Sequence, residues 1–395
     1  MTFSWLKKTS ALLALCVMLG SVSGCNGDAG SSEDGTAEGT VEATTSEAEE
    51  NAVKVGFIFN GEVDWDGYCA DANAQRLAAS THTDVESYYI DNVNITDFSE
   101  AVKRLQEAGC TYIVAGSWVY NNVLSEVAGK YMELKFISHG SRSRTVNISA
   151  YTDQMYEASY VAGMAAAYNS ETEKIGMVVD NSMLYMKPVV NAAALGTQLV
   201  YQNAELVTAF ASKSEEIRNA VDALAASGCD VIISYTESPE TVEYCNSKGI
   251  KVIGNLDYSK TAENYENLLM YFYADHDSYY LAQFKQIQLE NWEPGEYVGT
   301  LANGGVSISS ALPAAKDGTQ DIMSVLIPKI AKGEATIFAG ELKNVLDNII
   351  IQKGAMMEPS EIYSMDWYVK GVNTDLESFV VPRTDLTENS FEIVN

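Results

Sequence analysis

Short runs of consecutive apolar residues recur through the chain and alternate with longer stretches that mix apolar and polar positions. Residues 55–59 and 175–179 are two such runs. A continuous apolar run of this length is typical of a parallel strand that is buried on both faces. Strands that alternate with helices predict parallel, doubly wound sheets, so we assign the chain to the α/β class.

The chain also contains a weak internal repeat. Three segments occur twice in the same order, and the first residues of each pair lie 120, 119 and 116 positions apart. Each copy predicts the order strand, helix, strand, helix, strand, and Gly109 or Gly228 ends the helix before the second strand. We therefore predict two lobes of one topology. The pairs are 54–61 with 174–181, 101–114 with 220–233, and 134–138 with 250–254.

The repeat suggests the domain boundaries. We place lobe one at about residues 52–150 and lobe two at about residues 170–270, each completed by later crossover segments, in a bilobed domain of residues 52–373. Residues 374–395 then form a C-terminal extension. Crossover segments between two lobes predict a hinge, about which the lobes could close on a ligand.

Strand-end loops are the expected ligand site, because ligands of open α/β sheets bind beyond the carboxyl ends of the strands. The loop at residues 60–68 sets aromatic rings beside carboxylates, which suits a flat ligand that stacks and donates hydrogen bonds. Ordinary packing of the rings and solvated surface charge remain alternatives for each residue. The candidates from these loops are Asn60, Asp64, Trp65, Asp66, Tyr68, Ser117, Trp118, Tyr185, Tyr235 and Glu237.

The N-terminus predicts export and lipidation. Lys7 and Lys8 precede an apolar run at residues 11–19, which is shorter than the roughly 20 residues that span a bilayer. The run ends in Val-Ser-Gly before Cys25, an arrangement that resembles a bacterial lipobox. We predict a signal peptide at residues 1–24, diacylation of Cys25, and a disordered acidic tether at residues 25–51. A short membrane anchor with an incidental cysteine is the alternative.

The charge of the chain excludes some partners. A formal net charge of −29 argues against nucleic acid, whose phosphates require Lys and Arg, and against membrane binding through a basic patch. Attachment to the membrane would then depend on the predicted lipid on Cys25. The spacing of Cys69, Cys110, Cys229 and Cys245 fits no zinc pattern. Cys110 and Cys229 each precede an apolar run typical of a strand, so we expect these two thiols to be buried, although disulfides remain possible.

Catalytic machinery is not evident in the sequence. The chain has three histidines, His82, His139 and His276, and no nucleophile elbow, HExxH motif or P-loop. The glycines at 304 and 305 lack dinucleotide-binding spacing and predict a tight turn. Asp64 and Asp66 are a weak acid/base candidate, because they merely alternate on a loop. We expect a protein that is not an enzyme and has no cofactor and no metal.

Several segments together resemble the basic membrane protein (BMP) family of ABC-transporter substrate-binding lipoproteins, over roughly residues 52–373. Their order along the chain makes the resemblance specific. They are Lys54 to Gly61 followed by Asp66-Gly67-Tyr68, residues 147–151 and 157–166, residues 174–178, 191–196 and 228–232, and the closing motif at 365–372.

This resemblance implies a periplasmic-binding-protein type I fold. It also implies delivery of a purine nucleoside or nucleobase to an ABC permease and its ATPase, from the extracytoplasmic face of the cell membrane. Carried over by position, Phe59 and Trp118 would stack on the ligand, Glu237 would stand where relatives often have Asp, and Asp257 would contact ligand hydroxyls.

One segment departs from the nucleoside-binding pattern. Residues 268–277 are rich in aromatic side chains and lack the Lys of nucleoside-type members, which adds Tyr273 to the candidates and favours a heterocycle over a specific nucleoside. Sugar or vitamin binding by the same fold, and a ligand-sensing lipoprotein without transport, remain alternatives.

Overall fold

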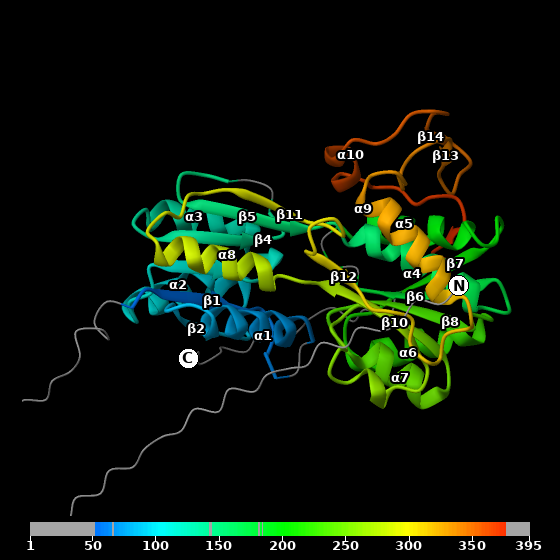
Figure 1. The fold of residues 1–395 in the computed structure, drawn as a ribbon, viewed down its shortest axis with the longest axis horizontal. Helices are drawn as coiled ribbons and strands as arrows, with labels where there is room; N and C mark the ends of the chain where they lie inside the picture. The colour runs from blue at the N-terminus through cyan, green and yellow to red at the C-terminus, as the bar shows by residue number, and fades with distance from the viewer. Residues whose placement is uncertain (1–51, 65–66, 142–143, 181, 184, 377–395) are drawn as a thin grey trace, which may run out of the picture. The chain divides into compact units, whose positions relative to one another are not determined.

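The computed structural model describes residues 52–64, 67–141, 144–180, 182–183 and 185–376. The predicted signal peptide, Cys25, the tether, Trp65, Asp66 and residues 377–395 lie outside these ranges. Within the described residues, the chain forms two large sheets and a small two-stranded sheet (Figure 1). None of the helices in these ranges is long and apolar enough to cross a membrane.

The first sheet is six-stranded and wholly parallel, in the order β11-β5-β4-β3-β1-β2. We call this sheet and its helices lobe one. Its strands are β1 (Lys54–Ile58), β2 (Glu86–Ile90), β3 (Tyr112–Ala115), β4 (Lys135–His139), β5 (Ile148–Asp153) and β11 (Glu296–Gly299). Its helices are α1 (Gly67–Thr81), α2 (Phe98–Glu107), α3 (Asn121–Lys130) and α8 (Asp277–Gln288), with short 3-10 turns η1 (Ile95–Asp97) and η2 (Trp118–Tyr120).

The second sheet is seven-stranded, in the order β12-β10-β9-β8-β6-β7-β15, and with its helices it forms lobe two. Its strands are β6 (Lys174–Val179), β7 (Glu205–Phe210), β8 (Val231–Tyr235), β9 (Lys251–Gly254), β10 (Leu268–Ala274), β12 (Val306–Ile308) and β15 (Val372–Asn373). Its helices are α4 (Met155–Asn169), α5 (Met186–Gln198), α6 (Ser214–Ala226), α7 (Glu240–Lys248) and α9 (Thr319–Ala331), with the 3-10 turn η3 (Ala262–Asn264). The small sheet, β13 (Leu342–Lys343) and β14 (Ile349–Ile351), precedes α10 (Pro359–Tyr363).

The two lobes share one topology, which confirms the predicted α/β class and doubly wound sheets. In each lobe the second strand of the repeat lies at one side of the first, and the third, fourth and fifth follow on the other side. Lobe two differs at its edges, because β12 runs antiparallel to β10 and β15 adds a strand beside β7. The repeat glycines Gly109 and Gly228 have φ values of 91° and 97°, as expected where helices α2 and α6 end.

Each large sheet is buried on both faces, which explains the continuous apolar runs. In β1, Val55 and Phe57 pack against α1 and α8, whereas Ile58 packs against α2 and α3. In lobe two, α6 and α7 cover one face, and α4, α5 and α9 cover the other. All four cysteines in the described residues are free and buried, so the prediction of buried thiols is confirmed.

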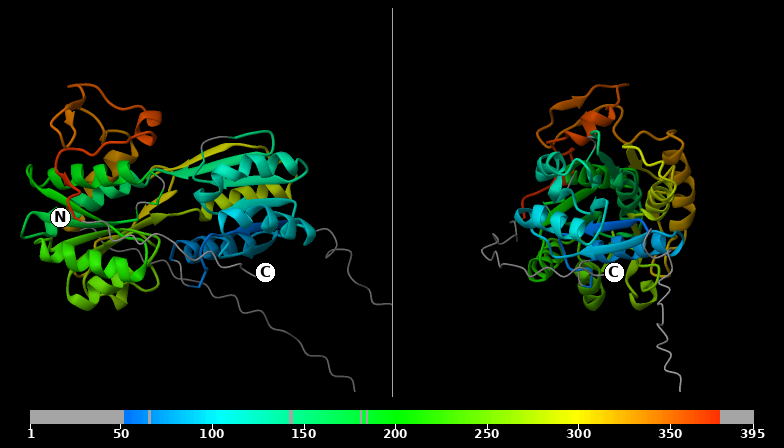
Figure 2. Two further views of the ribbon diagram at one scale, coloured as in Figure 1. Left: turned by 180° about the vertical axis from the view of Figure 1, so that it is seen from behind. Right: turned by 90° about the vertical axis from the view of Figure 1, so that its left-hand side faces the viewer.

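The chain passes between the lobes three times: from β5 to α4, from β10 to α8, and from β11 to β12 (Figures 1 and 2). Backbone hydrogen bonds join these crossovers. Gln154 donates to the carbonyl of Gly299 at 2.8 Å, and Asp275 donates to the carbonyl of Gly305 at 3.0 Å. The three crossovers therefore lie together beside the carboxyl ends of β4 and β5.

Candidate functional site

A pocket lies between the lobes, where the carboxyl ends of strands from both sheets face each other. The space between its walls, counted together with the open solvent at its mouth, is about 630 Å³. Its position agrees with the rule that ligands of α/β sheets bind beyond the strand ends. Its lining residues are Tyr68, Trp118, His139, Gly140, Thr152, Asp153, Met155, Met183, Tyr185, Tyr235, Thr236, Glu237, Asn255, Leu256 and Ala274.

Tyr68, in the first turn of α1, connects the lobes at this pocket. Its backbone N–H donates to the carbonyl of Glu237 in lobe two at 3.3 Å. Its hydroxyl donates to the carbonyl of Gly116 at 3.0 Å and lies 2.7 Å from Nδ1 of His139. The Tyr68 and His139 rings also stack, with centroids 5.4 Å apart and planes 16° apart. Burial raises the pKa of the Tyr68 hydroxyl well above its usual value, so it stays protonated.

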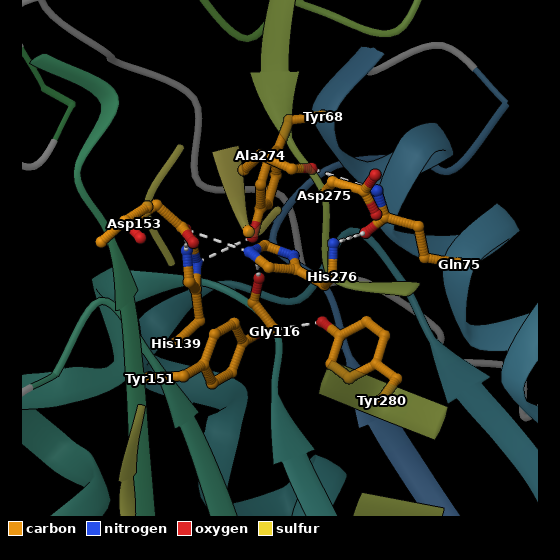
Figure 3. A network of polar contacts seen from close by, with 12 residues as sticks. Tyr68, Gln75, Gly116, His139, Tyr151, Asp153, Ala274, Asp275, His276 and Tyr280 are labelled. Atoms are coloured by element: carbon orange, nitrogen blue, oxygen red, sulfur yellow. Dashed lines mark hydrogen bonds and ion pairs between the residues drawn. The ribbon is translucent and has the colours of Figure 1, made fainter. Parts of the chain in front are cut away.

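Three ionisable side chains meet at the wall of the pocket (Figure 3). His139 and Asp153 end the adjacent strands β4 and β5, and His276 precedes α8 on the second crossover. The Oδ2 atom of Asp153 lies 3.0 Å from Nε2 of His276 and 3.4 Å from Nε2 of His139. The side chains are 5 % exposed for Asp153, 1 % for His276 and 12 % for His139. We call these three residues the His-Asp-His cluster.

Burial and charge act in opposite directions on this cluster. Burial favours the protonated form of Asp153, but attraction to the neighbouring imidazoles, that of His276 foremost, outweighs it and holds the pKa of the carboxyl well below its usual value. Burial lowers the pKa of His139, against the opposing attraction of Asp153. The carboxylate of Asp153 is therefore ionised at neutral pH, and the ring of His139 is neutral.

Aromatic side chains fix the cluster from within lobe one. The ring of Tyr151 on β5 lies 4.9 Å from that of His139 and meets that of His276 edge-on at 5.0 Å. The hydroxyls of Tyr151 and Tyr280 lie 2.7 Å apart (Figure 3). All of these rings are held in a packed core, so the cluster has little freedom to rearrange.

Lobe two supplies the opposite wall. Tyr235 ends β8 and is 4 % exposed, and burial raises the pKa of its hydroxyl. Asn255 follows β9, and its amide bonds both backbone groups of Thr236, accepting from the N–H at 3.3 Å and donating to the carbonyl at 2.8 Å. These bonds fix the loop that carries Glu237, and thus the position of that carboxylate at the pocket.

Five of the thirteen predicted ligand-binding residues line this pocket. They come from both lobes and from the loops that the strand-end rule selects. The five are Tyr68, Trp118, Tyr185, Tyr235 and Glu237.

Two other predicted residues pack inside lobe one. Phe59 is fully buried between Phe57 and Tyr89, with ring centroids 5.9 and 6.3 Å away, so it has no surface to offer a ligand in this structure. Ser117 is also fully buried, and its hydroxyl accepts the backbone N–H of Val119 at the start of η2. Their positions next to strand ends reflect packing and helix capping.

Four more are not among the residues that line the pocket. Asn60 is half-buried near the thiol of Cys69, and Asp64 is exposed. Asp257 accepts the backbone N–H of Ser259 at 2.8 Å, and Tyr273 stacks on Tyr271 at 6.2 Å. The remaining two predicted residues, Trp65 and Asp66, fall outside the described residues.

The cluster itself is not among the predicted site residues. Asp153 ends β5, so the strand-end rule applied to that strand would have selected it. His139 ends β4, so the same rule applied to that strand would have selected it too. His276 comes from a crossover between lobes, and no local pattern indicates that this segment returns to β4 and β5.

Comparisons with known proteins agree with this arrangement. A family model described as Bmp, ABC transporter substrate-binding protein PnrA-like, matches residues 52–332. A purine-binding protein of Brucella abortus is 26 % identical over 339 residues, covering 83 % of this chain and 95 % of that protein. A Haloferax volcanii protein, provisionally named an ABC transporter glucose-binding protein, is 23 % identical over 354 residues, covering 87 % of each.

A solved structure shows the same fold. An ABC transporter solute-binding protein from Aeropyrum pernix K1 superposes with a TM-score of 0.63 at 15 % identity, covering 79 % of this chain and 95 % of that one. The two parallel sheets and this likeness confirm the predicted periplasmic-binding-protein type I fold.

Proposed function

Because the chain belongs to the Bmp family of ABC transporter substrate-binding proteins, we propose that it captures a purine nucleoside, a nucleobase or a related flat heterocycle between its two lobes. The family's role is to bind a small molecule for a transporter, without catalysis.

The observation that carries the proposal is the composition of the pocket wall. Tyr68, Trp118, Tyr185 and Tyr235 bring aromatic rings to it from both lobes. Aromatic rings contribute apolar area and offset stacking, which suit a planar ligand. Apolar walls with a few fixed polar groups are typical of small-molecule sites.

Polar groups for a heterocycle are present on both sides. Glu237 and Asn255 in lobe two, and Asp153 in lobe one, reach the pocket. Carboxylates accept hydrogen bonds from ring N–H, amino or hydroxyl groups, and the Asn amide could donate or accept. The purine-binding name of the Brucella abortus relative supports this ligand class, at 26 % identity.

Lobe closure would complete the site. The three crossovers provide the hinge, and domain closure around ligands is a common motion of two-lobed binding proteins. The bond between Tyr68 and Glu237 already spans the lobes, so closure would not have to create the first contact between them.

We further propose that the bilobed domain spans residues 52–373, with lipid on Cys25 and the acidic segment at 25–51 as its tether. The closed form would then dock on the permease.

A ligand panel tests the proposal. The chain from residue 26 onward should show a raised melting temperature with nucleosides or nucleobases, measured by differential scanning fluorimetry. At a ligand concentration 100 times the dissociation constant, the free energy of unfolding should rise by about 2.7 kcal/mol. Vitamins and sugars are run beside them at the same concentrations. A shift with sugars and none with any heterocycle would refute the ligand class.

Sugar binding is the second candidate, because the Haloferax volcanii relative is named as a glucose-binding protein. Aromatic rings can also pack on the apolar face of a sugar ring. Glucose therefore belongs in the panel, and competition calorimetry between glucose and adenine would rank the two ligands directly.

A further inference from the structure

We propose that His139, Asp153 and His276 form a binding site for a divalent transition-metal ion of the zinc class, set in the wall of the ligand pocket. The site has two imidazole nitrogens and one carboxylate oxygen as donors. Metal binding here does not depend on the proposed heterocycle, and it can be measured without any organic ligand.

The distances within the cluster suit a shared ion. Zinc binds His nitrogen at about 2.0–2.1 Å and carboxylate oxygen at about 2.0–2.2 Å, so neighbouring donors of a tetrahedral site lie about 3.3–3.5 Å apart. The two nitrogen–oxygen separations here are 3.0 and 3.4 Å. All the candidate ligand atoms lie within 4.8 Å of one another. Both nitrogen–oxygen separations are thus close to those around one shared ion.

Hydrogen bonding assigns the free lone pair of His139. The Tyr68 hydroxyl has one hydrogen and donates it to the Gly116 carbonyl, which can only accept. Nδ1 of His139, 2.7 Å from the Tyr68 oxygen, then has to donate to it. A neutral ring that carries its hydrogen on Nδ1 has a lone pair on Nε2. That lone pair faces the Asp153 carboxylate at 3.4 Å, and a cation between them would satisfy both.

A second proton on His139 would compensate the Nε2 lone pair and the Asp153 carboxylate less well than a metal ion would. Nδ1 already donates to Tyr68, so a charged ring would add only one further hydrogen bond, to Asp153 across 3.4 Å. The bond from Nδ1 to Tyr68 is also the bond that a metal-binding histidine usually makes with its other ring nitrogen. Tyr68 would thus orient His139 for the ion.

Unused bonding capacity in the cluster points the same way. Among the described residues, Oδ1 of Asp153 and Nδ1 of His276 are buried and have no hydrogen-bond partner. Buried polar atoms without partners are uncommon and call for an explanation. An ion held by the Asp153 carboxylate would compensate the buried charge that Oδ1 leaves without a hydrogen bond, whereas Nδ1 of His276 would remain without a partner.

The donor set selects the kind of metal. Imidazole suits zinc, copper, iron and nickel, whereas magnesium and calcium prefer oxygen donors throughout. Three protein ligands leave a coordination position free. Because His139 and Asp153 line the pocket, that position would face the cleft, where water or a donor atom of the solute could occupy it.

Metal titration tests the proposal. The chain from residue 26 onward is stripped with a chelator and titrated with Co²⁺, and visible absorption reports nitrogen–oxygen coordination. One equivalent of Co²⁺ should bind and be displaced by Zn²⁺, and an excess of Mg²⁺ or Ca²⁺ should not displace it. Asp153→Asn and His276→Gln should each weaken Co²⁺ binding by on the order of 100-fold or more, because loss of a group that only orients a metal ligand already costs about 10–100-fold.

His82→Gln is the matched control, since His82 is the third histidine and lies exposed just after the end of α1. It should bind Co²⁺ as the unmodified chain does. Equal weakening by His82→Gln and His276→Gln, or no Co²⁺ absorption in the unmodified chain, would overturn the proposal.

A second measurement needs no variant, in case the cluster variants do not fold. The chain has three histidines, so its imidazole proton resonances are few. Substoichiometric Co²⁺ should shift or broaden the resonances of two rings and leave the third unchanged. Broadening of the His82 resonances alone would place the ion elsewhere and refute the site. If the protein still binds heterocycles after chelation, heterocycle binding does not require the metal. The metal proposal and the ligand proposal can then be tested independently.

Discussion

Gly299 and Asp153 end two neighbouring strands, and the carboxylate of Asp153 occupies the space that a side chain at position 299 would need. A Cβ atom added to Gly299 would clash with Oδ1 of Asp153. The two residues are paired across β11 and β5, at the point where two of the crossovers leave lobe one. The position of the carboxylate therefore depends on the absence of a side chain on the next strand.

Gly299→Ala should lower the free energy of unfolding by about 1–3 kcal/mol, as overpacking of a close-packed site does. It should also displace Asp153 and weaken ligand binding. Urea denaturation measures the first effect and calorimetry the second. Gly295→Ala is the control, because no atom lies within 4 Å of a Cβ added there. Equal stability of the two variants would contradict the packing argument.

Trp118→Ala should weaken binding of the preferred ligand by about 1 kcal/mol, the order of an aromatic stacking contact beyond its buried area. Trp118 lines the pocket at the start of η2. Trp118→Phe keeps a ring at the position and should recover much of the affinity. If the Ala variant binds as tightly as the unmodified chain, Trp118 serves packing only.

Tyr68→Phe should lower the free energy of unfolding by about 0.5–1.5 kcal/mol, because the Gly116 carbonyl loses its donor and His139 loses its partner. It should also weaken Co²⁺ binding by about 10–100-fold, as expected for loss of a group that orients a ligand. Tyr244→Phe is the matched control. It removes a hydroxyl that bonds Asp222 at the surface and should change neither quantity appreciably.

Acidification should destabilise the metal-free protein through His139. Burial lowers the pKa of this imidazole in the folded state, whereas the unfolded chain takes up the proton near the usual pKa of about 6.5. The unfolded state then binds more protons, so stability is full above pH 6.5 and falls as the pH drops below it. His139→Gln should flatten the decrease measured by urea denaturation from pH 7 to 5 in chelator, and His82→Gln should not.

Local pattern was sufficient for most of the fold. The apolar runs around Val55 and Ile175 predicted buried parallel strands, and both strands are buried on each face because helices cover both sides of the sheets. The internal repeat predicted that the two lobes have the same topology, because each copy carries the same order of strands and helices. The antiparallel β12 and the edge strand β15 escaped prediction, since strands of two or three residues carry little pattern of their own.

The site was predictable only where a loop directly follows a strand. Tyr235 and Glu237 lie at the carboxyl end of β8, so sequence position alone brings them to the pocket. Phe59 also follows a strand, yet its ring turns into the core, and side-chain direction is decided by packing. His276 reaches Asp153 across 123 residues, and such a contact depends on the path of the crossovers.

The three crossovers also determine the order in which the protein can fold during synthesis. Lobe one lacks α8 and β11 until residue 299 has been made, 146 residues after Asp153. At roughly 5–20 residues per second, the ribosome needs roughly 7–30 s to supply them. Until then, Val55 and Phe57, which pack against both α1 and α8, lack the cover that α8 gives them in the complete fold. Lobe one therefore reaches its full burial only after most of the sheet of lobe two has been synthesised.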